Sequence, residues 1–314
     1  MTNYVDRQTT LAEQVTLTGI GVHSGKPASI TLVPAEASVG IVFTRTDQDD
    51  IVEVPALWNK VSATALCTVL GDTSKEGVST VEHLMAALFG MGVDNLIVEI
   101  DGPEMPVMDG SSAAFVEVIE QIGLQKLDRG RRYLKINKTV RVDNGGAWCE
   151  LHPYDGTKFD ITIDFDTPLI GRQQFVSDMT PDVFRDDLSR ARTFGYVKDV
   201  EQLWKMGFAL GSSLENSVAI AEDKVLNPEG TRWPDEFARH KALDAVGDLA
   251  LAGLPIIGLY KSFKGGHKMN HSILVKLFED PSAFEIVEAP AFRQVGQVDK
   301  GGLAAAAAFG PDVS

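Results

Sequence analysis

The sequence predicts an α+β fold, and three observations support this prediction. Stretches that alternate apolar and polar residues, as half-buried strands do, come in runs before the helical stretches in both halves of the chain. This order favours layers of sheet and helix over a doubly wound sheet, in which strands and helices alternate. The length of 314 residues fits one large or two medium domains. The two halves can therefore share one plan, although no residue-level repeat is present.

In the first half, alternating stretches surround two helical ones. Strands are predicted at 14–35, which Gly and Pro interrupt, at 40–47 and at 94–102, and helices at 79–92 and 111–123. The first helix has a capping-box pattern, with Ser79 as N-cap and Glu82 three residues later, and Gly90 and Gly92 end it. The charged stretch 125–132 is predicted to be a linker. An N-terminal domain of residues 1–128 follows from this pattern.

The second half begins in the same way. A strand pair turning at Asn144-Gly145-Gly146 is predicted over 133–154, and a further strand at 158–168. A helix is predicted at 180–195, with Thr180 as N-cap and Pro181 at its first position, and a shorter helix at 198–207. Mostly strand is predicted at 212–228, a helix at 237–253, and strand, loop and strand over 254–280. These elements form a predicted C-terminal domain, residues 129–285. Residues 286–314 end in GGLAAAAAFGPDVS and are expected to be a flexible tail without a role in chemistry.

Composition limits the class of protein. A net charge of −15 argues against nucleic acid as a partner, because phosphate binding needs clustered Lys and Arg. The two cysteines, Cys67 and Cys149, give no disulfide framework and suggest a reducing compartment. The N-terminus has no signal pattern, and no apolar run approaches the roughly 18 residues of a spanning helix. We therefore expect a soluble, cytoplasmic protein without a transmembrane segment.

The predicted helix FARHKALDAVGDLALAG, residues 237–253, carries an unusual inner face. His240, Asp244 and Asp248 follow one another at intervals of four, so their side chains project along one face of the helix. Apolar neighbours make this the face that packs against the domain. Because unpaired buried charge is costly, these groups must meet partners, and a metal ion is one candidate. A chance occurrence of H-x-x-x-D with a structural role remains an alternative.

The other histidines offer further candidates. His83 directly follows Glu82 in the first turns of a helix, where a metal ligand and a base could lie side by side, although capping alone would explain Glu82. His267 follows two glycines in KGGHKMNH, which suits a loop that a ligand approaches, or a plain surface loop. His271 is expected on that surface, and His23 lies between glycines at a turn. The chain lacks the Walker, dinucleotide-binding and G-x-S-x-G motifs.

Two histidines and one carboxylate around zinc leave a fourth position for water, as in catalytic zinc sites. Zinc would lower the pKa of that water towards about 7. A nearby carboxylate such as Glu82 could accept its proton, and a second histidine could protonate a leaving amine. Asp248 would then be free to orient that histidine. Spacing alone does not show that these residues meet.

Several motifs occur in an order that resembles a known family. They are LTGIGVHSGKPASI, TVEHLMAAL, PVMDGSSAAFV, LSRARTFG, VLNPEG, and FARHKALDAVGDL followed by GGHKMN. Together they resemble the UDP-3-O-acyl-N-acetylglucosamine deacetylase family of lipid A biosynthesis, from about residue 8 to 280. The resemblance implies a monomeric zinc-dependent amidase that removes acetate from UDP-3-O-(3-hydroxyacyl)-N-acetylglucosamine, in the committed step of that pathway. It also implies two similar layered α+β domains with the active site between them. Fe²⁺ would be accepted by the same two-histidine, one-carboxylate ligand set.

Carried over by motif, the resemblance implies a role for each polar candidate. Zinc is held by His83, His240 and Asp244; Glu82 is the general base; His267 is the general acid, supported by Asp248; Thr193 hydrogen-bonds the oxyanion; and Lys241 helps to hold the substrate. An oxyanion contact of this kind is typically worth about 3 kcal/mol.

The resemblance also implies contacts with the acyl chain and the nucleotide. Phe194, Val200, Leu203, Ala209, Ser213 and Leu214 fall where the family lines an apolar passage, Phe165 matches an aromatic that stacks on uracil, and His23 is counted among the substrate contacts. The first set would equally suit an amphipathic packing segment, and Phe165 a core position. The family often has a lysine where Ala147 stands, so that phosphate contact is missing or comes from another residue. Cys67 matches a cysteine that can act as an extra zinc ligand, or is a small buried residue.

Two other classes of protein remain as alternatives. Non-haem iron oxygenases use the same two-histidine, one-carboxylate set, but they need a cosubstrate site. A binding protein for acylated sugar nucleotides would need no turnover. The presence of both Glu82 and His267 beside a complete ligand set favours hydrolysis over both.

Overall fold

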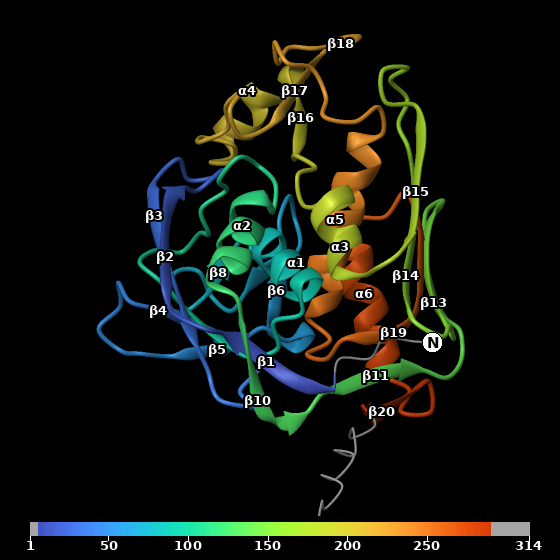
Figure 1. Ribbon diagram of the computed structural model, residues 1–314. Helices are drawn as coiled ribbons and strands as arrows, with labels where there is room; N and C mark the ends of the chain where they lie inside the picture. Colours follow the sequence, from blue (N-terminus) through green and yellow to red (C-terminus); the bar gives the residue numbers. More distant parts are fainter. Residues whose placement is uncertain (1–5, 290–314) are drawn as a thin grey trace, which may run out of the picture.

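The computed structural model describes residues 6–289 and confirms the α+β class. Two main sheets lie at opposite sides of the molecule, and the helices fill the space between them (Figure 1). Within the described range, no helix is both long and apolar enough to cross a bilayer. The predicted tail falls mostly outside the described residues.

All strands of the first sheet come from the first half of the chain. Its order is β2 (Val15–Ile20), β3 (Pro27–Pro34), β9 (Leu96–Ile100), β4 (Ile41–Arg45) and β5 (Glu53–Pro55). Alternate residues of β3 are buried, and Ile30 and Leu32 share a core with Leu84 of α1. The helices α1 (Glu82–Met91) and α2 (Ala113–Ile122) complete this half, together with the small sheet of β6 (Val61–Ala63), β7 (Val69–Leu70) and β8 (Val78–Ser79) and the 3-10 turn η1 (Trp58–Lys60).

The second sheet is built around β19, Ile256–Phe263. This strand pairs with β13 (Ala147–His152), with β11 (Arg132–Ile136) and with β14 (Thr157–Asp164), while β12 (Val140–Asn144), β15 (Arg172–Asp178) and β20 (Phe284–Glu288) extend the sheet. The predicted turn between β12 and β13 is confirmed, because Asn144 pairs with Ala147. The helices α5 (Glu236–Ala250) and α6 (His267–Phe278) belong to this half and pack against each other.

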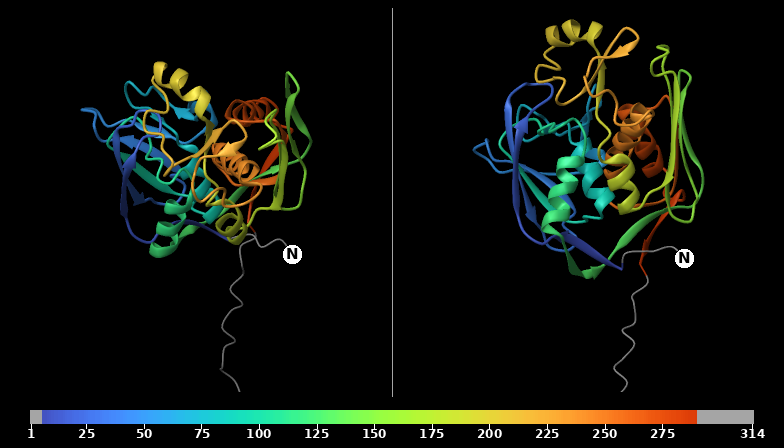
Figure 2. Two further views of the ribbon diagram at one scale, coloured as in Figure 1. Left: turned by 90° about the horizontal axis from the view of Figure 1, so that it is seen from above. Right: turned by 45° about the horizontal axis from the view of Figure 1, so that its top comes forward.

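Smaller elements close the two ends of the molecule. At the top in Figure 1 lie β16 (Phe194–Tyr196), α4 (Val197–Lys205), β17 (Val218–Ala221) and β18 (Lys224–Val225). At the bottom, β1 (Arg7–Leu11) pairs with β10 (Leu124–Gly130), and β10 leads from the first half to β11 of the second. The short α3 (Pro181–Val183) and the π-helical turn η2 (Phe184–Leu188) lie next to α5, as both views of Figure 2 show.

The two halves meet where α1 packs against α5. A Cβ atom added to Gly247 of α5 would lie 2.0 Å from the backbone oxygen of Glu82 and 3.1 Å from the backbone nitrogen of Ala86. Only glycine permits such a close approach of two helix backbones. The contact therefore sets the distance between the first turn of α1 and the middle of α5.

The structure differs from four of the predicted elements. Residues 212–228, predicted to be mostly strand, are mostly turn and loop around the short β17 and β18. Residues 267–278 form α6 and not a strand, because Met269, Ile273 and Leu277 recur at helical spacing and are buried together. The predicted linker 125–132 forms most of β10 and the start of β11. The charged side chains of β10 stay exposed because β10 pairs only with β1 in a two-stranded ribbon, whereas Arg131, between the two strands, is buried in an ion pair with Asp94. The helix predicted over 180–195 ends at Leu188, although its Thr180 cap is confirmed by a hydrogen bond from the backbone of Val183.

The boundaries of the predicted domains also differ slightly from the elements. The boundary after residue 128 falls inside β10, and β20 continues past residue 285 to Glu288, antiparallel to β11. Residues 286–288 therefore belong to the second sheet and not to a tail.

Replacing Gly247 by alanine tests the helix contact. In an open helix this change would stabilise by about 1 kcal/mol, but here the new methyl group overlaps the backbone of α1, so we expect a loss of about 1–3 kcal/mol in unfolding free energy. Urea denaturation measures this loss. The control is Gly102→Ala, where the new Cβ meets nothing within 4 Å. Equal stability of the two variants would contradict the proposed constraint.

Candidate functional site

The inner face of α5 is buried, as its spacing predicts. His240 is 2 % exposed, and Asp244 and Asp248 are each 1 % exposed. Across the contact with α1 lie Glu82 and His83, also buried. The structure therefore brings together five predicted residues from two segments of the chain that are more than 150 positions apart.

Three of these residues form a cluster suited to a metal ion. His83 Nε2 lies 3.7 Å from Asp244 Oδ1, and His240 Nε2 lies 3.4 Å from the same oxygen. All three ligand atoms lie within 4.8 Å of one another. Asp244 Oδ1 is buried and has no hydrogen-bond partner. A buried carboxylate oxygen without a partner is costly, and a cation between it and the two imidazole nitrogens would remove that cost. The residues fit a zinc-type site.

The neighbours of the cluster prepare it for a cation. His240 Nδ1 lies 3.0 Å from the carbonyl oxygen of Ala191, which fixes the ring and leaves Nε2 free to bind. Burial lowers the pKa of His240 to about 3, so its imidazole is neutral. Burial opposes the charge of Asp244, yet His240, Lys241 and His267 hold its pKa well below the ordinary value. Since His240 is neutral, the contacting cation is Lys241, whose Nζ donates to Asp244 Oδ2 at 2.8 Å.

Glu82 and His267 form a pair next to the cluster. His267 Nε2 lies 3.8 Å from Glu82 Oε1 and 3.9 Å from Asp244 Oδ2. Burial raises the pKa of Glu82. Burial would lower the pKa of His267, but Asp248, Glu82 and Asp244 surround it and raise that pKa to about 9. The pKa of Glu82 thus suits a group that accepts a proton, and the pKa of His267 suits a group that donates one.

The predicted capping box at α1 is wrong. Ser79 lies in β8, and α1 has Val81 as its N-cap without a side-chain hydrogen bond. The carboxylate of Glu82 instead accepts a hydrogen bond of 3.0 Å from the backbone N–H of Thr68. Glu82 is therefore free of a capping role and faces the site.

His267 is the first residue of α6 and is held from behind. Its Nδ1 lies 2.9 Å from Asp248 Oδ2, as the predicted support by Asp248 requires. Asp248 has two further partners that the sequence does not predict, which are Thr68 and Asn270. Asn270 is one helical turn from His267, so a correct prediction of α6 would have placed both on one face. His271, expected on the surface, is half-buried, and its Nε2 lies 3.0 Å from the carbonyl oxygen of Trp58.

A cavity of about 280 Å³ opens from the cluster towards β16 and α4. The predicted residues that line it are His23, Glu82, His83, Thr193, Phe194, Val200, Leu203, Ala209, His240, Lys241, Asp244 and His267. Burial lowers the pKa of His23. Phe165, Ser213 and Leu214 do not line this cavity. Phe165 packs edge-on against Phe194, with ring centroids 5.8 Å apart, and Ser212 and Ser217 line the wall where Ser213 was expected.

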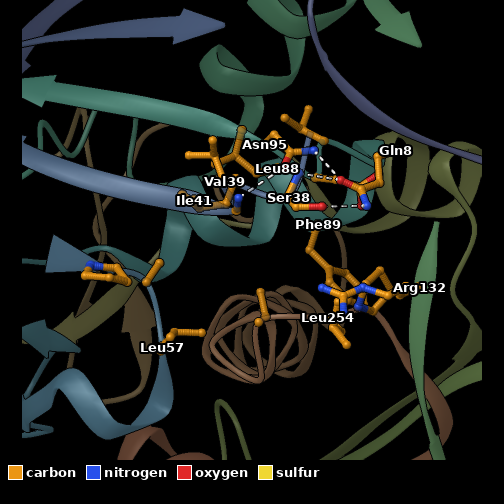
Figure 3. A pocket seen from close by; sticks show the side chains of 18 of the residues that line it. Gln8, Ser38, Val39, Ile41, Leu57, Leu88, Phe89, Asn95, Arg132 and Leu254 are labelled. Carbon is orange, nitrogen blue, oxygen red and sulfur yellow. Dashed lines mark hydrogen bonds between the residues drawn. The ribbon is translucent and has the colours of Figure 1, made fainter. Parts of the chain in front are cut away.

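A second cavity, of about 310 Å³, lies between the two halves on another side of α1 and α5 (Figure 3). Apolar side chains such as Ile41, Leu57 and Leu88 line it. At its edge, the amide nitrogen of Asn95 donates a hydrogen bond to the amide oxygen of Gln8. None of the predicted site residues lines it. Chemistry and not size therefore distinguishes the candidate site.

Two other predicted positions lie outside the cluster. Cys67 is buried, and burial raises the pKa of its thiol to about 12, so it is a neutral thiol. It is not one of the three clustered ligands. Ala147 begins β13 and does not line the cavity.

The fold and the site define an α+β protein with a two-histidine, one-carboxylate candidate metal centre between its halves. Comparison with known proteins gives the family. The model of the family described as UDP-3-O-acyl N-acetylglycosamine deacetylase matches residues 8–279. Relatives named UDP-3-O-acyl-N-acetylglucosamine deacetylase from Brucella ovis and Brucella canis are each 53 % identical over 283 residues, which cover 90 % of this chain and 99 % of theirs. One from Brucella melitensis is 52 % identical over the same length. The chain belongs to the UDP-3-O-acyl-N-acetylglucosamine deacetylase family.

Metal binding should appear as a gain in stability. An ion that binds only the folded chain stabilises it by about 2.7 kcal/mol at one hundred times its dissociation constant. We expect zinc to raise the thermal unfolding midpoint of the chelator-treated protein. Asp244→Asn should abolish this rise, whereas Asp160→Asn, on β14 away from the cluster, should keep it. The same rise in all three proteins would show that zinc binds elsewhere.

The raised pKa of His267 predicts a pH dependence in the metal-free protein. A folded-state pKa of about 9, above the ordinary 6.5, means that protonation of His267 stabilises the fold fully below about pH 6.5 and ceases to do so as the pH rises through 9. The difference in unfolding free energy between the parent chain and His267→Gln should therefore shrink from pH 6 to pH 9.5. His271→Gln is the control on the same helix. A difference that stays constant over this range would contradict the shifted pKa.

Proposed function

We propose that the chain is a zinc-dependent deacetylase that hydrolyses the N-acetyl group of UDP-3-O-(3-hydroxyacyl)-N-acetylglucosamine to the free amine and acetate, the committed step of lipid A biosynthesis. One observation carries this proposal. The partnerless oxygen of Asp244 faces His83 and His240, directly beside the pair Glu82 and His267. The family of the chain and the names of its relatives supply the substrate.

His83, His240 and Asp244 would hold the zinc ion and leave a fourth coordination position open. When bound, zinc lowers the pKa of water and polarises a carbonyl oxygen. Iron(II) accepts the same ligands, so the test must compare the two metals.

Glu82 accepts the proton of the attacking water. Its Oε2 is held by the backbone N–H of Thr68, while its Oε1 is the oxygen 3.8 Å from His267 Nε2. Because burial raises the pKa of Glu82, its carboxylate is a better base than an exposed one. The water oxygen forms the new bond to the acetyl carbon as its proton passes to Glu82.

His267 completes the reaction as the general acid. With a pKa of about 9 it is protonated at neutral pH, and its Nδ1 is held by Asp248, so Nε2 carries the proton to be donated. That proton passes to the amide nitrogen as the carbon–nitrogen bond breaks, which gives the amine and acetate. The hydroxyl of Thr193, on the cavity wall, would hydrogen-bond the carbonyl oxygen as negative charge develops on it.

The shape of the cavity supports the proposed substrate. Val200, Leu203 and Ala209 line an apolar wall that suits an acyl chain, and Phe194, which also lines the cavity, lies edge-on to His240 with ring centroids 6.2 Å apart. Lys241 also lines the cavity and would help to hold the charged part of the substrate.

We also propose the division into domains at residues 128 and 129. Each main sheet takes all its strands from one side of this boundary, which supports the division. Cys67 and Cys149 are both free thiols, which supports a reducing, cytoplasmic compartment. A monomer is proposed from the family resemblance alone.

The test is acetate release from UDP-3-O-(3-hydroxyacyl)-N-acetylglucosamine. A chelator should abolish release, and one equivalent of zinc or of iron(II) should restore it. Glu82→Gln should lower kcat by about 10²–10⁴-fold, because the base is lost while the metal ligands remain. Glu285→Gln, in an exposed ion pair with Lys135, is the control.

Other outcomes separate the alternative functions. Tight binding of the substrate by fully metallated protein without any acetate release would indicate a binding protein. Oxygen consumption with iron(II), unaffected by Glu82→Gln, would indicate an oxygenase. Acetate release that Glu82→Gln leaves unchanged would contradict the assigned base.

A further inference from the structure

One buried residue is hydrogen-bonded both to the proposed base, Glu82, and to Asp248, the carboxylate behind the proposed acid. Thr68, just before β7, is 1 % exposed. Its backbone N–H donates to Glu82 Oε2 at 3.0 Å, and its hydroxyl donates to Asp248 Oδ1 at 2.5 Å. The hydroxyl also lies 3.4 Å from His267 Nδ1. Thr68 therefore ties Glu82, from the first half of the chain, to Asp248, from the second.

The other oxygen of Asp248 is held just as closely. Oδ2 lies 2.9 Å from His267 Nδ1 and accepts a hydrogen bond of 2.8 Å from Asn270 Nδ2. The hydroxyl of Tyr260 donates to Asn270 Oδ1 at 2.6 Å, so the amide group can offer only its nitrogen to Asp248. Asn270 and Tyr260 are both 2 % exposed. A buried series of hydrogen bonds thus runs from Tyr260 of β19 through Asn270 and Asp248 to His267.

We propose that Thr68 and Asn270 are positioning residues for the reaction, because they fix the Asp248 carboxylate that orients His267. This inference rests on the proposed function. With a donor on Oδ1 and two on Oδ2, Asp248 cannot turn without breaking a buried hydrogen bond. The imidazole of His267 then has one orientation, with Nδ1 on Asp248 and Nε2 towards Glu82.

Without either donor, the imidazole of His267 should spend only part of the time in the orientation that points Nε2 towards Glu82. When a residue that orients a functional group from behind is replaced, activity typically falls by about 10–100-fold. Because neither residue lines the cavity, substrate binding should change little. A purely structural role would instead lower stability without a selective effect on kcat.

The experiment compares four single variants of the zinc-loaded chain in the acetate assay. Thr68→Val removes the hydroxyl but keeps the backbone bond to Glu82, and Thr68→Ser restores a hydroxyl. Asn270→Ala removes the amide. Asn95→Ala is the matched control, because Asn95 is 1 % exposed and also bonds through its amide, but to Gln8, Thr9 and Gly40 away from the site.

We expect Thr68→Val and Asn270→Ala to lower kcat by about 10–100-fold, with KM changed by less than about threefold. Thr68→Ser should recover most of the activity, and Asn95→Ala should keep kcat although it lowers the unfolding midpoint. In an Asp248→Ala background, Thr68→Val should cause little further loss, because the residue it positions is gone. Losses in kcat no larger than that of Asn95→Ala, or fully additive losses with Asp248→Ala, would overturn the proposal.

A second readout is independent of turnover. In protein labelled with ¹⁵N-histidine, the Nδ1–H signal of His267, identified by its loss in His267→Gln, should be sharp in the parent chain and broadened in Thr68→Val and Asn270→Ala. An unchanged signal in both variants would overturn the positioning role. Absence of acetate release by the parent chain, with this signal still dependent on Thr68, would overturn the proposed function and not the hydrogen-bonded arrangement.

Discussion

The close contact between α1 and α5 is the constraint on which the candidate site depends. At Gly247 the two helix backbones approach so closely that a single methyl group would overlap the carbonyl of Glu82. Glu82 and His83 lie in the first turn of α1, whereas His240 and Asp244 lie on α5. Neither helix carries a complete set of metal ligands. The site therefore exists only at the separation that the glycine permits, and a metal ion there would in turn hold the two halves together.

Buried charge explains why so many polar side chains surround this contact. Asp244 and Asp248 lie in an interior where an unpaired carboxylate is costly. Three of their four oxygens have donors within 3 Å, from Lys241, from Thr68, and from His267 together with Asn270. Only Asp244 Oδ1 lacks a partner. The accounting of hydrogen bonds thus points to one position for a cation, between this oxygen and the two imidazole rings.

The sequence predicts those parts of the site that depend on local periodicity. The spacing of His240, Asp244 and Asp248 is enough to place them on one buried face. Thr68 gives no local signal, because its role arises from contacts with residues 14 and 180 positions away. Asn270 was missed because a strand was predicted where α6 lies. Ser213 and Leu214 are expected on the cavity wall from the family resemblance alone, but they lie beyond the turn at Gly207 and Ala209, which both have positive φ, and do not line the cavity.

The two histidines proposed as metal ligand and proton donor differ in protonation because their neighbours differ. Burial disfavours the charged form of both. Around His240, burial together with His83 and the positive Lys241 outweighs the single carboxylate of Asp244, so the ring stays neutral and can bind a metal. Around His267, the carboxylates of Asp248, Glu82 and Asp244 outweigh burial and keep the ring protonated. A metal ligand and a proton donor can therefore be distinguished by the charges they face, since an acid and a ligand need opposite protonation states at the same pH.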